Sequence, residues 1–441
     1  MRRAIDNAVV WDGERVIERG SIGIEDEYIV ALTDRPDGRF AADERVDAEG
    51  RLAIPGLINA HTHLYGSLAR GLSLPEYGPR TFTQILEQLW WKLDKALDDS
   101  SVTTSALIGA MEAARCGVTS LIDHHASPNA IPGSLDRVRD AVCRRVGLRA
   151  ALGYEVSDRD GEERAALGIE ENARFLSTLD PQDRLWSAHF GLHASFTLGD
   201  RTLAAAAAAI PDGAGIHIHV AEGPEDERDC VDHHGLRIVE RLDRFGLLRP
   251  RSILAHCLHV DRGEKDRIAE RDAIVVHNPR SNMNNAVGTF DLAGFLDRGV
   301  VAGLGTDGLG ANLLAELFTA GLAQRQTRQD ALAGTFPQLD RLLFRNNPAI
   351  VERTFGVRAG RLAPGAAADV AVLDYVAPTP LNADNVLGHL LFGVAVHAFR
   401  VHDLYVAGRP ILRGGAFVDI DEQAEYARAR EEAGRLWKRI A

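Results

Sequence analysis

Two histidines separated by a single residue, His61 and His63, end a short and mostly apolar segment that follows the turn at Pro55 and Gly56. Residues 57–60 are typical of a buried strand. Alternate side chains of a strand point to the same face, so both imidazoles leave this strand side by side. Such a pair can bind one metal ion, although two hydrogen-bonded structural histidines would fit the same pattern. The remaining ligands must come from the rest of the chain.

Ligand-type residues also end or occupy most of the other apolar segments. They are Asp123, His124 and His125; His189 and His193; His217, His219 and Glu222; His256 and His259; His277; and Asp307. One histidine at a strand end is usually structural. The carboxyl ends of parallel strands converge on one mouth of an α/β barrel. The large number of histidines at these ends therefore indicates a metal site.

Three imidazoles and one carboxylate form an established donor set for zinc or iron(II). The predicted ligands are His61, His63, Asp307 and one histidine of the segment 215–220. His217 and His219 share a strand face, so both remain possible at this point. His219 is preferred because it lies nearer the carboxyl end of the strand and three residues before Glu222.

The elements that would position these residues are eight short apolar segments separated by segments of helical period. The predicted strands cover 57–63, 118–124, 148–154, 185–193, 215–220, 252–257, 273–277 and 300–306. This alternation predicts an α/β fold, a (β/α)₈ TIM barrel over residues 55–359. Residues 1–54 and 360–418 are rich in short strands and turns, which predicts a small β-sandwich domain built from both chain ends. Residues 419–441 are predicted to contain a charged C-terminal helix.

The composition excludes several classes of partner. Among 441 residues, 50 are basic and 63 acidic, which gives a formal net charge of −13. Nucleic acid and anionic membranes are therefore not expected as partners. Apolar segments of about 18 residues are missing from the sequence, and the basic first residues are not followed by an apolar signal segment. The four cysteines form no C-x-x-C pair, which favours a reducing, cytoplasmic compartment.

The lysines limit the number of metal ions. Some barrel hydrolases hold a second metal on a carboxylated lysine at a strand end. Here the lysines are Lys92, Lys95, Lys265 and Lys438, and none falls on a predicted strand. A site with one divalent ion is therefore expected, with zinc preferred and iron possible.

Together these motifs resemble the amidohydrolase superfamily, in its mononuclear deaminase and chlorohydrolase branch. The matching segments are PGLINAHTH at 55–63, HVAE at 219–222, AH at 255–256, HNPRSN at 277–282, GTDG at 305–308 and GRLAPGAAAD at 360–369. A closer resemblance is to the aminohydrolase SsnA group, through LWWKLD at 89–94, IDHHASP at 122–128, SNMNN at 281–285 and PTPL at 378–381. The Asp-His-His segment is also similar to that of 8-oxoguanine deaminases.

The resemblance implies hydrolytic deamination of an amino-substituted N-heterocycle, such as a guanine-like purine, an oxidised purine or a pterin. Metal-activated hydroxide would attack the ring carbon, and Glu222 would protonate the adjacent ring nitrogen. Asp307 would accept the proton of the water, and His256 would hydrogen-bond the hydroxide. A surface position for Glu222 and a structural role for His256 are the alternatives.

Substrate contacts are expected from His193, His124, Tyr65 and Asn282, although each could instead serve packing or a turn. The expected partners are a small heterocyclic substrate and water, and the chain is expected to form a homo-oligomer. The alternative functions are chloride or alkylamine release from a triazine-like ring and a non-enzymatic barrel scaffold. The scaffold predicts a broken ligand set, whereas this sequence contains a complete one.

Overall fold

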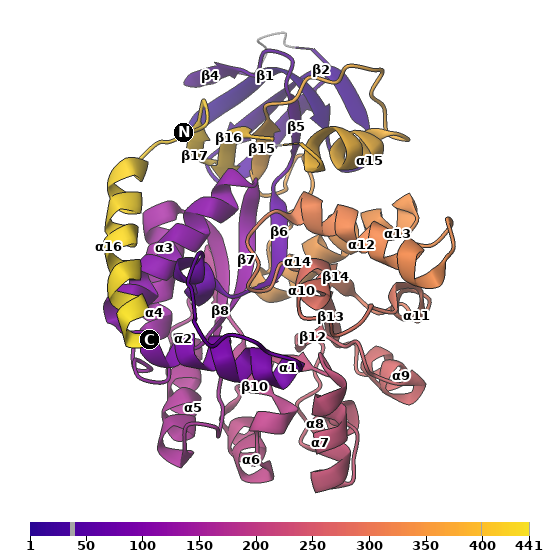
Figure 1. The fold of residues 1–441 in the computed structure, drawn as a ribbon. Coiled ribbons are helices and arrows are strands. Elements are labelled where there is room, and N and C mark those ends of the chain that lie inside the picture. Colours follow the sequence, from indigo (N-terminus) through magenta and orange to yellow (C-terminus); the bar gives the residue numbers. More distant parts are fainter. Residues whose placement is uncertain (36–39, 398, 441) are drawn as a thin grey trace.

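The structure, a computed structural model, describes residues 1–35, 40–397 and 399–440. A mixed sheet of nine strands lies at one end of the molecule (Figure 1). Its strands run in the order β18-β17-β16-β15-β5-β1-β2-β3, with β4 paired to β1. The bounds are β1 (Arg2–Trp11), β2 (Val16–Glu25), β3 (Tyr28–Thr33), β4 (Glu44–Asp47), β5 (Leu52–Pro55), β15 (Val370–Leu373), β16 (Val401–Val406), β17 (Arg409–Arg413) and β18 (Ala416–Phe417).

The two chain ends meet where β5 pairs with β15, with Ala53 opposite Val372. Hydrogen bonds therefore join all nine strands into one mixed sheet, the small β domain that was predicted from both chain ends. The sheet has an apolar cluster of its own. It includes Ile5, Val10, Ile22, Ile24, Leu362 and Val370.

Gly56 alone separates β5 from β6, the first strand of the barrel. Parallel strands form two sheets, one of β6 to β9 and one of β10 to β14. Their bounds are β6 (Leu57–Thr62), β7 (Val118–His125), β8 (Arg149–Tyr154), β9 (Trp186–Ala188), β10 (Phe190–Ala194), β11 (Ile216–Val220), β12 (Ile253–His256), β13 (Ile274–His277) and β14 (Ala302–Leu304). Isolated parallel bridges join the two sheets at both seams, Val156 to Leu192 and Thr62 to Asp307.

The predicted fourth strand is divided at His189. The backbone N–H of His189 still donates to Leu152 of β8, whereas that of Phe190 donates to Gly215, just before β11. The segment changes its pairing partner at this residue, so it contributes β9 to one sheet and β10 to the other.

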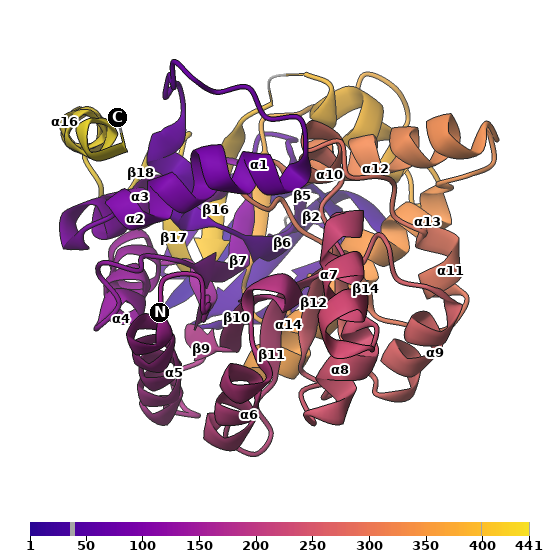
Figure 2. The ribbon, with the colours of Figure 1, turned by 60° about the horizontal axis from the view of Figure 1, so that its bottom comes forward.

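Helices surround the strands, and α1 lies near their ends (Figure 2). Their bounds are η1 (Leu64–Ala69), α1 (Phe82–Ile85), η2 (Leu86–Trp90), α2 (Trp91–Ala96), α3 (Asp99–Arg115), α4 (Ser134–Arg139), η3 (Asp140–Val146), α5 (Glu162–Ser177), η4 (Ser195–Thr197), α6 (Asp200–Ala209), α7 (Pro224–His234), α8 (Ile238–Arg244), α9 (Arg262–Glu270), α10 (Pro279–Asn284), α11 (Leu292–Leu296), α12 (Leu313–Arg328), α13 (Phe336–Asp340), η5 (Arg341–Asn346), α14 (Asn347–Phe355), α15 (Val386–Gly388), η6 (His389–Ala395) and α16 (Glu422–Ile440).

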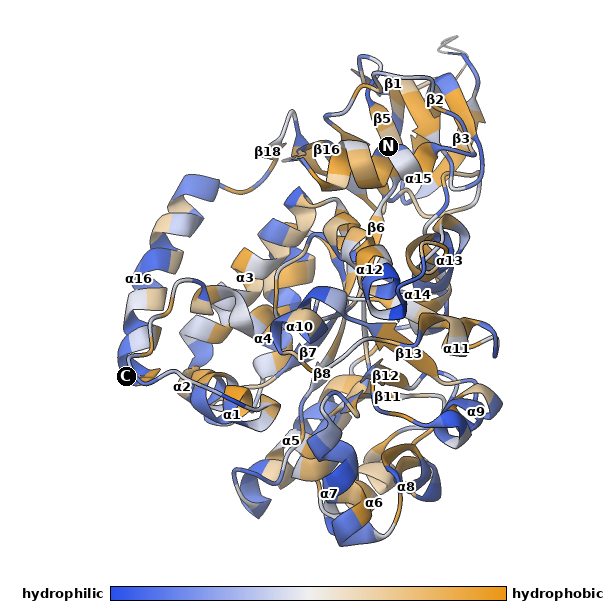
Figure 3. Cartoon of the chain, turned by 45° about the vertical axis from the view of Figure 1, so that its right-hand side comes forward, coloured by the Kyte–Doolittle hydropathy of each residue, from blue (hydrophilic) through white to orange (hydrophobic). Residues whose placement is uncertain are grey.

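Burial explains why the strands are so apolar. Every residue of β6, β7 and β8 is buried because helices cover the outside of the barrel while side chains fill its interior. Figure 3 shows hydrophobic residues concentrated on the strands and hydrophilic ones on outer helices such as α7 and α16. None of the helices in the described ranges has the length and apolar character needed to cross a bilayer.

A buried ion pair connects the barrel to the mixed sheet. Arg149 of β8 bonds the carboxylate of Asp369, and both side chains are almost inaccessible to solvent. The same carboxylate accepts a 2.8 Å hydrogen bond from the backbone N–H of Ala407. Asp369→Ala should therefore lower the free energy of unfolding by about 3–5 kcal/mol, because it leaves a buried guanidinium without its partner. Urea unfolding of the variant would measure this loss, and an unchanged midpoint would contradict it.

Candidate metal centre and active site

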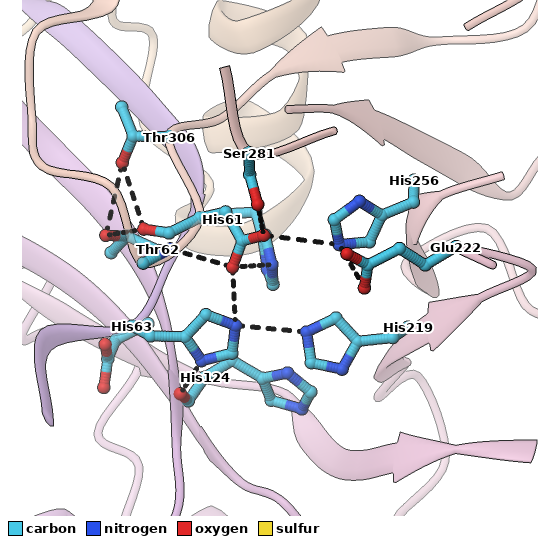
Figure 4. A network of polar contacts seen from close by, with 12 residues as sticks. His61, Thr62, His63, His124, His219, Glu222, His256, Ser281 and Thr306 are labelled. Carbon is cyan, nitrogen blue, oxygen red and sulfur yellow. Dashed lines mark hydrogen bonds and ion pairs between the residues drawn. The ribbon is translucent and has the colours of Figure 1, made fainter. Parts of the chain in front are cut away.

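The two histidines of the first barrel strand point into a cluster of polar side chains (Figure 4). His61 is fully buried, and its Nδ1 lies 2.8 Å from Nε2 of His217. Nδ1 of His63 lies 2.7 Å from the carbonyl oxygen of His124, so this nitrogen must carry the donated proton. The lone pair of a neutral His63 is then at Nε2, on the side of the ring that faces the cluster.

His219 of β11 is held in the same way. Its Nδ1 lies 2.9 Å from the carbonyl oxygen of His193 and donates to it, which leaves the lone pair at Nε2. The Nε2 atoms of His63 and His219 are 3.1 Å apart, and a carboxylate oxygen of Asp307 lies 3.0 Å from Nε2 of His63. Two facing lone pairs and a carboxylate repel each other unless a cation lies between them. The donor set therefore fits a divalent metal ion.

His61 and His256 extend this donor set. Nε2 of His61 lies 3.7 Å from Asp307 and, within the described ranges, has no hydrogen-bond partner. Ligand atoms of His61, His219, His256 and Asp307 all lie within 4.8 Å of one another. A second group with the same spacing consists of His61, His63, His124 and His219.

The structure distinguishes the two histidines of β11. His217 shares its Nε2 with Nδ1 of His61, whereas Nε2 of His219 faces His63. The four predicted ligands His61, His63, His219 and Asp307 thus lie together, and His217 lies behind His61 as a supporting residue.

Asp307 is held at the centre of the cluster by its backbone and its neighbours. It lies in the left-handed region, with φ of 54°. One carboxylate oxygen accepts a 2.8 Å hydrogen bond from the N–H of Gly308, and the other accepts a 2.5 Å bond from the hydroxyl of Ser281. Burial alone would raise the pKa of Asp307, but the neighbouring imidazoles of His61 and His63 hold this pKa well below its usual range. The group is therefore an anion at neutral pH.

Glu222 and His256 form a second polar pair beside the donor set. A carboxylate oxygen of Glu222 lies 3.3 Å from Nε2 of His256, and the other accepts a 3.1 Å bond from Asn285. Burial raises the pKa of Glu222 to about 7, so a large part of this group is protonated at neutral pH. Nε2 of His256 also lies 3.6 Å from Asp307.

A cavity of about 50 Å³ connects these groups to solvent. Its polar lining includes the predicted metal ligands His63, His219 and Asp307 together with Glu222. Tyr65 and His193 also line it, and aromatic side chains form much of the remaining wall: Phe82, Trp90, Trp91 and Phe196. Flat aromatic walls suit a planar heterocycle.

The other two predicted substrate contacts lie elsewhere. His124 is fully buried and stacks on the ring of His217, with centroids 4.3 Å apart, beneath the cavity wall. Asn282 is also buried, and its side-chain oxygen lies 2.8 Å from Nδ1 of His256. Its amide nitrogen lies 3.3 Å from His277. Neither residue is among those that line the cavity, and the contact of Asn282 with His256 suits a positioning role.

Glu155 and Arg159 are among the cavity residues that were not anticipated from the sequence. Glu155 directly follows β8, and burial alone would raise its pKa, but the adjacent imidazole of His63 lowers this pKa to about 2. Arg159 lies over the ring of Trp91 at 5.3 Å and pairs with Asp94. Both residues line the cavity. The position of Glu155 immediately after a predicted strand was a usable signal, since strands of this barrel carry site residues at their carboxyl ends.

Comparison with known proteins agrees with this geometry. The model of the amidohydrolase family matches residues 52–411. A 5′-deoxyadenosine deaminase of Methanothermobacter thermautotrophicus is 33% identical over 431 residues, which cover 95% of each chain. A 5-methylthioadenosine/S-adenosylhomocysteine deaminase of Haloarcula marismortui is 31% identical, over 96% of this chain and 95% of the relative.

Solved structures show the same architecture. A zinc-bound adenosine deaminase from Xanthomonas campestris aligns with a TM-score of 0.84 and 25% identity, over 99% of this chain and 98% of the other. A zinc complex of atrazine chlorohydrolase from Arthrobacter aurescens aligns with a TM-score of 0.81 and 21% identity, over 98% and 100%, which bears on the fold alone. The chain therefore belongs to the amidohydrolase family and is a hydrolase that acts on carbon–nitrogen bonds other than peptide bonds.

Proposed function

We propose that the protein is an aminohydrolase that removes the ring amino group of an adenosine-like nucleoside or a related purine and releases ammonia. One observation carries the proposal. A protonatable carboxyl group, Glu222, lies in the same cavity as the facing nitrogens of His63 and His219. Deamination of such a ring needs these two components, a proton donor for a ring nitrogen and a site that activates water.

The metal ligands in this proposal are His61, His63, His219 and Asp307, with one zinc ion per chain. Such an ion would lower the pKa of a water molecule towards neutrality. The donor set of buried nitrogens with unused lone pairs supports this assignment. The zinc-bound adenosine deaminase of the same fold supports zinc.

In this proposal, Glu222 and Asp307 each carry out a different proton transfer. Glu222 gives its proton to the ring nitrogen next to the carbon that is attacked, because its raised pKa keeps a protonated fraction available. Asp307, an anion, accepts one proton from the attacking water and passes it to the departing amine, and the remaining hydroxyl proton returns to Glu222 as the ring carbonyl forms. His256 lies 3.3 Å from Glu222 and 3.6 Å from Asp307, so it can hydrogen-bond the oxygen that adds to the ring.

The substrate class is proposed from two sources. The relatives that share 33% and 31% identity are named as deaminases of 5′-deoxyadenosine and of 5-methylthioadenosine or S-adenosylhomocysteine. The aromatic walls formed by Trp90, Trp91 and Phe196 favour a planar ring of purine size. Guanine-like purines, oxidised purines and pterins present the same amino-substituted ring and belong in the same test.

Ammonia release from a substrate panel tests the proposal. Zinc-loaded protein would be incubated with 5′-deoxyadenosine, 5′-methylthioadenosine, guanine, 8-oxoguanine and a pterin, and a chlorotriazine would be assayed for chloride. We expect ammonia from at least one member of the panel. Chloride release without any ammonia would replace the proposal with the triazine alternative, and two ions per chain in metal analysis would contradict the single-ion site.

Replacement of Asn282 should reduce turnover without touching the substrate. In Asn282→Ala, Nδ1 of His256 loses its 2.8 Å partner, so the imidazole is no longer held towards Glu222 and Asp307. We expect kcat to fall on the order of 10–100-fold with little change in KM. Steady-state kinetics of the variant measures kcat and KM separately. Asn282→Asp keeps the acceptor oxygen and should recover part of the lost kcat. A rise in KM alone would instead indicate substrate contact.

A further inference from the structure

A buried carboxylate that the mechanism above leaves without a role, Glu155, lies in the wall of the substrate cavity. Its side chain is 4% exposed, and its backbone N–H donates to the carbonyl oxygen of His125 at 2.8 Å. Oε1 lies 3.1 Å from Nδ1 of His63, but that nitrogen already donates to His124 at 2.7 Å. Across the described segments Oε1 has no hydrogen bond of its own.

The second oxygen of this carboxylate faces another acceptor. Oε2 of Glu155 lies 3.9 Å from Nε2 of His193, which is too far for a direct hydrogen bond. Nδ1 of His193 lies 2.7 Å from the hydroxyl of Thr197, and this hydroxyl uses its own proton on the carbonyl of Ala194 at 3.0 Å. Nδ1 must therefore donate, and the neutral imidazole has its lone pair at Nε2.

Two acceptors thus border a narrow gap, and both belong to residues that line the cavity. Both residues are nearly buried and have no hydrogen bond between them at 3.9 Å, so a donor that enters the cavity with the substrate can pair with these acceptors. We infer that Glu155 and His193 together bind an N–H or O–H group of the substrate and thereby select substrates that carry one. The inference rests on the proposed deaminase function and adds the donor requirement to it.

The position of Glu155 limits which part of the substrate it can bind. The imidazole of His63 has Glu155 on its Nδ1 side and Asp307 on its Nε2 side. Glu155 and Asp307 thus lie on opposite sides of this ring. Trp91 and Phe196 flank His193, with ring centroids 6.4 and 6.0 Å away, so an aromatic surface adjoins the acceptor pair.

Two kinds of substrate meet this requirement. The edge of unmodified adenine offers acceptor nitrogens apart from the amino group that is lost. A donor must then come from the ribose hydroxyls of a nucleoside or from an additional ring N–H, such as that of an 8-oxopurine.

Matched substrate pairs test the inference and identify the donor. The first comparisons pair 5′-deoxyadenosine with its 2′,5′-dideoxy analogue and with its 3′,5′-dideoxy analogue, and the last pairs 8-oxoguanine with guanine. In each pair the donor-bearing member is the one with the additional ribose hydroxyl or ring N–H. We expect the wild-type kcat/KM to favour the donor-bearing member of one pair on the order of 10–100-fold. In Glu155→Gln an amide that can present N–H₂ replaces one of the two acceptors and no longer favours a donor of the substrate, so the preference should fall to near unity.

Two further variants guard against a general loss of structure. His193→Phe removes the second acceptor but keeps an aromatic ring beside Trp91, and it should reduce the same preference. Glu171→Gln is the matched control, because Glu171 is a buried carboxylate that accepts from the backbone of Gly133 and Leu135, away from the cavity. It should keep the wild-type preference. Equal losses for both members of a pair in Glu155→Gln, together with loss of zinc, would show that Glu155 only supports His63 and would overturn the inference.

Binding measurements separate this inference from the proposed function. If the wild type deaminates no compound, the proposed function fails, and the fluorescence of Trp90 and Trp91 can still report binding of the same pairs. Tighter binding of the donor-bearing member by the wild type, lost in Glu155→Gln, supports the acceptor pair. Equal binding of both members, or binding of neither, overturns it.

Discussion

Glu222→Gln should lower kcat on the order of 10²–10⁴-fold while the zinc content stays at one ion per chain. The amide keeps the size of the side chain and can still contact His256, which lies 3.3 Å from the carboxylate. It cannot give a proton to a ring nitrogen, however, so the loss should appear in the chemical step. Single-turnover kinetics with metal analysis on the same sample measures both quantities.

Glu225→Gln is the matched control for this experiment. Glu225 lies three residues further along the same acidic segment, in the first turn of α7. It is absent from the residues that line the cavity, so its replacement should leave kcat unchanged. Full activity in Glu222→Gln would remove Glu222 from the mechanism and would leave the proton donor unassigned.

Asp307→Asn should have a comparable effect on kcat/KM, on the order of 10³-fold, but with loss of metal. The carboxylate lies 3.0 Å from Nε2 of His63 and is the only anion among the four proposed ligands. Its replacement removes negative charge from the donor set and also removes the group that accepts the proton of water. Metal analysis after dialysis should find less than one ion per chain, and activity should not return when zinc is added.

Asp123→Asn is the matched control for the second experiment. Asp123 is a fully buried carboxylate at the end of β7 that accepts a 2.7 Å hydrogen bond from the N–H of Leu64. An asparagine oxygen can keep that bond, so metal content and turnover should remain close to wild type. An Asp307→Asn variant that holds one ion and turns over normally would contradict the proposed ligand set.

The barrel and the positions of its ligand-type residues followed from local patterns. Apolar segments of strand length alternate with helical ones, and their polar ends meet because parallel strands converge on one mouth. His61, His63, Glu222 and Asp307 were identified from such ends, and they lie in or beside one cavity. The terminal helix was predicted over Glu422–Ile440, and the structure has α16 over the same residues.

Pairing between distant segments could not be predicted in the same way. The exchange of partners at His189 depends on two neighbouring strands, β8 and β11, that are distant in sequence. The single sheet of nine strands depends on the pairing of β5 with β15, more than 300 residues apart. No local periodicity encodes either choice, because a strand presents the same pattern to any partner.

His61-Thr62-His63 by itself determined that two imidazoles share one strand face, since the side-chain period of a strand is two residues. The same period made His217 and His219 equivalent in the sequence. Only the tertiary structure separated them, because it placed the ring of His61 against His217 and left Nε2 of His219 facing His63. It likewise turned Asn282 towards His256 and brought Glu155 beside His193. Sequence determines which face a side chain occupies, whereas the hydrogen bonds available to its atoms depend on groups that folding brings from other strands.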